Sequence, residues 1–131
     1  MRAVDTNVLV RALIQDDPAQ TKRALSLMDA HQVFVPVTVV LELEWVLRSR
    51  YGFAPVVIAQ ALAKIASLEN AVIGEHTAVV AATENMARGW DFADALHHAL
   101  SEGCDDFATF DSALAKRAKR NPLTKPPVVA V

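Results

Sequence analysis

Cysteine is nearly absent from this sequence, in which Cys104 is the only one among 131 residues. A single cysteine excludes an internal disulfide framework and a cysteine-rich zinc site, and it suits a reducing cytoplasm. An excess of positive charge is missing as well, because 13 Lys and Arg stand against 15 Asp and Glu, a net charge of −2. The cations are unevenly placed, however. The segment 112–131 holds five of them and no acid, so this part of the chain is basic.

Long apolar runs are also missing. The most apolar window, Val33–Leu47, is interrupted by a proline and two glutamates, and it does not predict a membrane span. Near the start of the chain, Asp5 stands where a signal peptide needs its apolar stretch. We therefore expect a soluble, cytoplasmic protein that does not associate with a membrane.

Short apolar runs alternate with longer segments of helical period. The runs are too short for helices and predict strands at Arg2–Val4, Val33–Val35, Ala71–Ile73, Phe107–Thr109 and Val128–Val131. Capping residues and prolines predict helices at Pro18–Ala30, from Pro55 onward, at Thr77–Arg88 before Gly89, and at Phe92–Glu102 before Gly103. Strands separated by helices pair in parallel. With 53% hydrophobic residues, the chain predicts one α/β domain over residues 1–131, a three-layer α/β/α fold around a central parallel sheet of about five strands.

Two aspartates directly follow predicted strands. Asp5 lies just past the first strand and Asp111 just past the fourth. Ligands of open parallel sheets bind beyond the carboxyl ends of the strands, so both residues are candidates for a site. Their neighbours Thr6, Asn7 and Thr109 are candidates to orient a carboxylate or a bound water. Each aspartate is also explained as the N-cap of the following helix.

Two glutamates lie in the apolar segment 37–47. Successive helical residues turn by about 100°, so Glu42 and Glu44 point to nearly opposite sides of a helix. Glu42 shares a face with the apolar residues three before and four after it, which makes it the candidate for the site. The alternative for Glu42 is a carboxylate that offsets the helix dipole. Glu44 is expected to be a solvated charge paired with Arg48.

A further pair of acids opens the helix predicted from Phe92. Asp91 is a natural N-cap, and Asp94 follows at the third helical position, beside the buried stripe. We expect Asp94 to look along the sheet toward the strand ends. Offsetting the helix dipole is the alternative role of both acids. His97 and His98 form no zinc pattern with another ligand and are expected on the exposed face.

If these acids converge, few kinds of ligand and reaction suit the site that they form. Several carboxylates close together repel one another and cannot all stay ionised without a cation. Oxygen ligands without His or Cys suit Mg²⁺ or Mn²⁺, which keep several waters and share a phosphate with the protein. Such an ion activates water for in-line attack on a phosphoryl group. Water is then the expected nucleophile, because the sequence shows no Ser–His–Asp or Cys–His set.

Four segments of the chain together resemble a known family. In chain order they are Val4–Arg11, Leu41–Gly52, Asp91–Leu96 and Thr109–Asp111. They resemble the ordered motifs of PIN-domain nucleases over essentially the whole chain, and most closely those of VapC-type toxins from bacterial and archaeal toxin–antitoxin pairs. The first and third segments are moderately specific by themselves, and the ordered set is highly specific.

The resemblance implies an endoribonuclease that depends on Mg²⁺ or Mn²⁺, forms a homodimer and is inhibited by a VapB-type antitoxin. The family's catalytic acids fall on Asp5, Glu42, Asp94 and Asp111. Asp5 and Asp94 are the implied metal ligands. Thr109 falls on the small hydroxyl residue before the last acid, and Asp91 is either a cap or an outer ligand.

Two other functions stay open at this point. A haloacid-dehalogenase-like phosphatase also places an Asp after its first strand and uses Mg²⁺. It needs a second Asp two residues later, where this chain has Asn7. An idle PIN-like module would bind RNA or protein without cutting, and the presence of four mutually repelling acids counts against it.

Two expectations concern binding surfaces. Lys116, Lys119 and Arg120 can share one face of a short helix, where they either contact an RNA backbone or remain solvated. A mean hydropathy of +0.23 is high for this length and indicates apolar surface left for a partner, around Trp45 and the helix from Pro55. An acidic pocket also offers a docking point for an Arg or Lys of an antitoxin.

Overall fold

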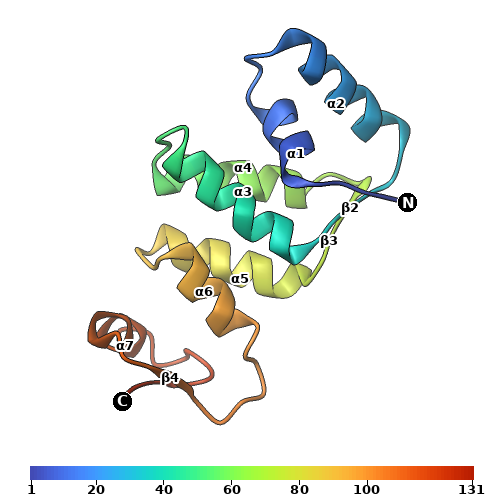
Figure 1. Cartoon of the computed structure of the whole chain (residues 1–131). Coiled ribbons are helices and arrows are strands. Elements are labelled where there is room, and N and C mark those ends of the chain that lie inside the picture. Colours follow the sequence, from blue (N-terminus) through green and yellow to red (C-terminus); the bar gives the residue numbers. More distant parts are fainter.

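The computed structural model describes residues 1–131 as five strands and seven helices (Figure 1). In chain order the elements are β1 (Arg2–Ala3), α1 (Thr6–Leu13), α2 (Pro18–Ala30), β2 (Val33–Val35), α3 (Val37–Ser49), α4 (Pro55–Ala66), β3 (Ala71–Ile73), α5 (His76–Ala87), α6 (Phe92–Ala99), β4 (Phe107–Thr109), α7 (Ser112–Lys119) and β5 (Val128–Ala130). Three strands have the predicted bounds, and the other two are one residue shorter.

The helix boundaries follow from local capping. Asp17 precedes the proline that starts α2 and accepts a hydrogen bond from the Gln20 N–H at 3.1 Å. Gly89 follows the C-cap of α5 with a φ of +101°, a left-handed conformation that glycine adopts without steric cost. The helix α6 ends at Ala99, three residues earlier than predicted, and Gly103 belongs to the turn beyond it.

All strand pairings are parallel, as predicted. β2 lies between β1 and β3, with Val33 opposite Arg2 on one side and Ala71 on the other. β4 pairs with β5, with Phe107 opposite Val128. The α/β class is confirmed, but the five strands form a three-stranded and a two-stranded sheet rather than one central sheet. β1 contributes two residues, both exposed, so it offers a neighbour neither a long ladder nor a buried side chain.

One hydrophobic core joins these parts, consistent with a three-layer α/β/α domain. A cluster of 23 buried residues extends from Val4 to Val128 and includes Leu114 and Ala118 of α7. α1 and α2 lie at one end of the molecule and α7 with β4 at the other (Figure 1). Between them, α3 packs against α1 and α6, and α5 packs against α4 and α6. No helix is both long and apolar enough to cross a bilayer.

Candidate active site

Thr6 brings Glu42 next to the start of α1. Asp5 is the N-cap of α1, and its Oδ1 accepts a hydrogen bond from the Val8 N–H at 3.2 Å. The adjacent Thr6 side chain is buried, and its Oγ1 donates a hydrogen bond to Oε1 of Glu42 on α3. Asp5, Thr6 and Glu42 therefore form one group, which we call the α1–α3 group.

Glu42 opens onto a hollow of about 340 Å³ between α3 and α6. Thr38 and Trp45 line this hollow from α3, and Ala93 lines it from the first turn of α6. Trp45 is half exposed there. Because Ala93 directly precedes Asp94 in the chain, the hollow connects the α1–α3 group with the start of α6.

The start of α6 carries two of the predicted acids. Asp91 is the N-cap, and its Oδ2 accepts a hydrogen bond from the Asp94 N–H at 3.1 Å. The Asp94 side chain lies in the first turn and is only partly exposed. The helix dipole favours a carboxylate at this position, while burial opposes its ionisation.

The start of α7 carries the last predicted acid. Oδ1 of Asp111 accepts hydrogen bonds from the N–H groups of Ala113 and Leu114, at 2.9 and 3.1 Å. Oγ1 of Thr109 accepts a hydrogen bond from the Asp111 N–H at 3.0 Å and so fixes the turn that leads into α7. Asp91, Asp94, Thr109 and Asp111 make up what we call the α6–α7 group.

The capping role predicted as an alternative is confirmed for Asp5, Asp91 and Asp111. Each of them accepts its capping bonds through a single carboxylate oxygen. The second oxygen of each remains available, since an ionised carboxylate can accept at both oxygens. Capping and ligand binding are therefore compatible at these positions.

Burial raises the pKa of the Asp94 carboxyl above its usual value. The negative charges of Asp91 and Asp111 raise it further, while His97 and Arg117 act in the opposite direction. Asp94 thus lies within electrostatic reach of the other two acids of its group. The nearby cations therefore compensate the charged form of this carboxylate only in part, and a bound metal ion would stabilise it further.

The contacts of the four predicted acids link them in two groups. No three Asp, Glu, His or Cys side chains lie together in a way that could hold one metal ion. Asp5 and Glu42 belong to the α1–α3 group, and neither is among the charges that shift Asp94. The cause is the sheet arrangement, because Asp5 follows β1 and Asp111 follows β4, and these strands belong to different sheets.

The donor chemistry of the α6–α7 group fits a hard divalent cation. Its donors are carboxylate and hydroxyl oxygens, and Mg²⁺ is commonly held by one or two carboxylates plus waters and substrate phosphates. Asp94 with either Asp91 or Asp111 meets that requirement. Neither His97 nor Cys104 completes a zinc-type set with them.

Glu44 is not the solvated charge that the helical wheel predicted. It is 2% exposed, and its carboxylate forms an ion pair with Nε of Arg48 at 3.0 Å. The pairing was predicted, and the burial was not. The buried face of α3 runs through Val40, Leu43 and Leu47, whereas the sequence analysis placed the apolar face one residue earlier, on the side of Glu42. The pKa of Arg48 is raised, mainly by its hydrogen bond to Glu44.

His98 was expected on an exposed face and is instead 4% exposed. Its Nε2 donates a hydrogen bond to the carbonyl of Pro126 at 2.8 Å, and its ring packs against Trp90 and Phe107. This histidine therefore ties α6 to the chain segment before β5. Its contacts give it a structural role.

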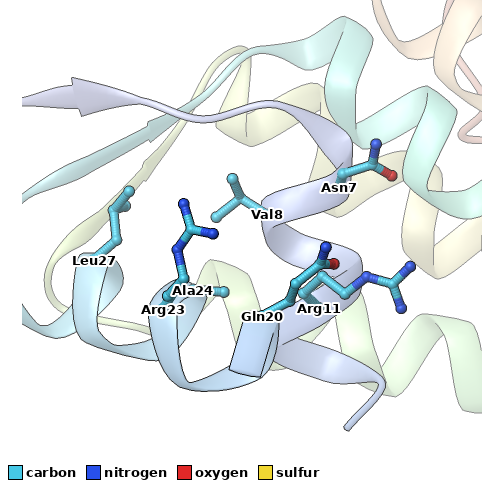
Figure 2. Close-up of a pocket in the computed structure, with 7 residues that line it drawn as sticks. All are labelled: Asn7, Val8, Arg11, Gln20, Arg23, Ala24 and Leu27. Atoms are coloured by element: carbon cyan, nitrogen blue, oxygen red, sulfur yellow. The ribbon is translucent and has the colours of Figure 1, made fainter. Parts of the chain in front are cut away.

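Asn7, predicted to support the acids, lines a groove of about 310 Å³ between α1 and α2. Arg11, Gln20 and Arg23 supply the other polar side chains of this groove. Figure 2 shows Arg23 reaching toward Val8 across the groove, while the guanidinium of Arg11 points away from it. Arg11 is paired with Asp16 at 2.7 Å, so its charge is already compensated.

Comparison with known families decides what kind of domain carries these groups. The PIN domain family model matches residues 2–120. The chain belongs to the PIN domain family. No curated protein and no solved structure matches it.

Membership of the PIN family indicates a nuclease with RNA as its substrate. PIN domains in general use divalent metal ions. The match covers all four segments from which the resemblance was drawn. It favours the nuclease over the phosphatase considered from the sequence. In this PIN domain, the α1–α3 and α6–α7 groups are the acidic candidates for the catalytic site.

Replacing Asp94 with asparagine is expected to stabilise the metal-free protein. The raised pKa means that the folded state binds the Asp94 proton more tightly than the unfolded chain does. The stability that this tighter proton binding contributes is fully present below the pKa of Asp94 in the unfolded chain, near 4. It is lost as the pH rises through the pKa of Asp94 in the folded state. Asp94→Asn should therefore raise the melting temperature at pH 7 by about 2 °C in EDTA, and the gain should vanish in acid.

Differential scanning fluorimetry at several pH values measures this effect. The exposed Asp105 provides the control, because Asp105→Asn removes the same charge outside the group. An Asp94→Asn protein that melts at or below the parent temperature at pH 7 would contradict the expectation.

Proposed function

We propose that this PIN domain protein is an endoribonuclease that hydrolyses RNA phosphodiester bonds with a water activated by Mg²⁺ or Mn²⁺. The observation that supports it most is the partly buried Asp94 beside Asp91 and Asp111. Three acids at two helix starts cost the apo protein electrostatic repulsion. A bound cation would offset this repulsion, so a cation-dependent activity accounts for the three acids.

In this proposal Asp5 and Asp94 become ligands of the metal when the α1–α3 and α6–α7 groups come together, and Glu42 and Asp111 complete the acidic site. The bound ion would lower the pKa of a water and neutralise charge on the phosphoryl group. Thr6 orients the Glu42 carboxylate through its hydrogen bond.

Thr109 and the capping bonds of Asp111 fix the turn before α7. These contacts hold the acids in place before the substrate arrives.

The two groups would act on one phosphodiester if the free edges of β1 and β4 approached each other. β1 pairs only with β2, and β4 pairs only with β5, so each strand has one unpaired edge. Such edges favour further pairing. Parallel pairing of β1 with β4 would place Asp5 and Asp111 at the same end of one five-stranded sheet.

Metal removal tests the proposed activity. A fluorogenic single-stranded RNA should be cut in Mg²⁺ or Mn²⁺. EDTA should abolish the cleavage, because without the ion nothing in the proposed site lowers the pKa of the attacking water or neutralises charge on the phosphoryl group. Excess Mg²⁺ should restore the cleavage, and this recovery would show that the chelator had not damaged the protein. A single-stranded DNA of the same sequence serves as the substrate control. Cleavage that continues in EDTA, or the absence of any RNA cleavage with metal, would contradict the proposal.

We also propose that the protein is the toxin of a toxin–antitoxin pair, a homodimer inhibited by a VapB-type antitoxin. The ordered motifs support this reading. So do the exposed apolar side chains of Trp45, Val56 and Val57 on α3 and α4, which leave apolar area for a partner. Light scattering measures the dimer, and co-purification with the product of a neighbouring reading frame tests the antitoxin.

A further inference from the structure

Three arginines line one hollow near the C-terminal end of the molecule. Arg88, Arg117 and Arg120 face a space of about 430 Å³ between the end of α5 and α7. The other lining residues are polar or aromatic, namely Asn85, Trp90, Asn121 and Thr124. No acid lines this space. We call it the arginine hollow.

The three arginines of this hollow have no ion-pair partner within the chain. None of its three arginines forms an ion pair, whereas Arg11 is paired with Asp16 and Arg48 with Glu44. An adjacent hollow that shares Arg88 also contains Glu84 and Glu102, but neither forms an ion pair with it. Three unpaired guanidinium groups around one space repel one another, so this arrangement favours an anionic occupant.

Local structure explains how the three arginines converge. α7 turns its small and apolar residues Leu114, Ala115 and Ala118 into the core, which leaves Arg117 partly buried beside them. The Arg117 side chain reaches the turn that follows α5, because its Nε lies 4.0 Å from the position that a Cβ atom would take at Gly89.

Arg88 and Arg120 are the C-caps of α5 and α7. A cation at a helix C-terminus offsets the dipole. That role accounts for each residue singly, and it does not account for three guanidinium groups around one space.

The arginine hollow adjoins the acids. Arg117 acts electrostatically on Asp94, and it lies on the helix that Asp111 caps. An RNA strand with one phosphate at the α6–α7 group can therefore place a neighbouring phosphate at the arginines. Lys116, Lys119 and Arg120, predicted from the sequence as backbone contacts, are all exposed. Arg120 lines the hollow and the two lysines do not.

We propose that the arginine hollow binds phosphate groups of the RNA strand flanking the bond to be cut. The inference rests on the proposed ribonuclease function, whose substrate it positions. Guanidinium groups bind phosphate oxygens with two parallel hydrogen bonds. An acidic peptide is less suited, because Trp90 is the only apolar side chain of the lining and is itself buried.

The test compares two pairs of substitutions that each remove two positive charges. Arg88→Gln with Arg120→Gln removes two of the three arginine charges that line the hollow. Lys116→Gln with Lys119→Gln is the control, at α7 positions that do not line it. Affinity for a fluorescein-labelled single-stranded RNA of about twelve nucleotides is measured by anisotropy in EDTA over a range of salt. The arginine pair should weaken binding about tenfold and flatten the slope of log K against log[salt] by about 1.4. The lysine pair should cause less than half of either change.

A merely structural role of the arginines would lower the melting temperature without changing the salt slope. If the glutamine pair fails to fold, Arg88→Lys with Arg120→Lys keeps the charge and loses the two-point geometry. That pair should weaken RNA binding and retain the salt slope. Equal effects of the arginine and lysine pairs would overturn the proposal. The proposal would also be overturned if the protein with Arg88→Gln and Arg120→Gln lost binding to polyglutamate but bound RNA as tightly as the parent.

The two proposals fail in different ways. A protein that cuts RNA but binds it equally well without the arginines retains the ribonuclease function and loses the hollow as its phosphate site. A protein that binds RNA through the arginines and does not cut it, with metal present, retains the phosphate site and loses the ribonuclease function.

Discussion

An Asp5→Asn protein is expected to fold like the parent and to cut RNA at least about 10³-fold more slowly. The asparagine carbonyl can still accept the Val8 N–H, so the N-cap of α1 is preserved. The negative charge is lost, and with it the proposed contact to the metal. Single-turnover cleavage in Mg²⁺, together with a melting curve, measures both effects.

Asp17→Asn is the matched control for this substitution. Asp17 is also an N-cap aspartate, of α2, and it accepts the Gln20 N–H at 3.1 Å in the same manner. The control should keep the full cleavage rate. If Asp5→Asn cut RNA as fast as Asp17→Asn, Asp5 would have no part in the site.

Arg48→Met is expected to have the largest effect on stability. The Glu44 carboxylate is buried, and Arg48 is its only ion-pair partner. Removal of the partner leaves a buried charge uncompensated, which costs 3–5 kcal/mol in fully buried pairs. The Arg48 side chain is 46% exposed, so water can replace part of the interaction. We therefore expect a loss of about 2 kcal/mol in urea unfolding.

The double variant Glu44→Met with Arg48→Met separates the cost of an unpaired charge from the value of the pair. Because it removes both charges, it should recover most of the stability lost in the single variant. Arg50→Met, at an exposed arginine without an ion pair, should change stability by less than about 0.5 kcal/mol. A double variant less stable than Arg48→Met would show that packing by these side chains, rather than charge, dominates.

Much of the secondary structure was predictable because its signals are local. Asp17, Asp91 and Asp111 each cap a helix through backbone N–H groups two or three residues further along the chain. Gly89 ends a helix through its own φ. Such signals act within one helical turn and need no knowledge of the rest of the chain. The parallel pairing followed from the alternation of strands and helices.

The sequence by itself thus determined the elements, the α/β class and the family motifs with their acids. Only the tertiary structure decided which residues meet. Thr6 binds Glu42 across 36 positions and His98 binds Pro126 across 28, so burial at these sites depends on packing between distant segments. The same packing buries Glu44, divides the strands between two sheets and gathers Arg88, Arg117 and Arg120 around one hollow. Helical periodicity gives the angle between two side chains of one helix, but the neighbouring elements decide which face is turned inward.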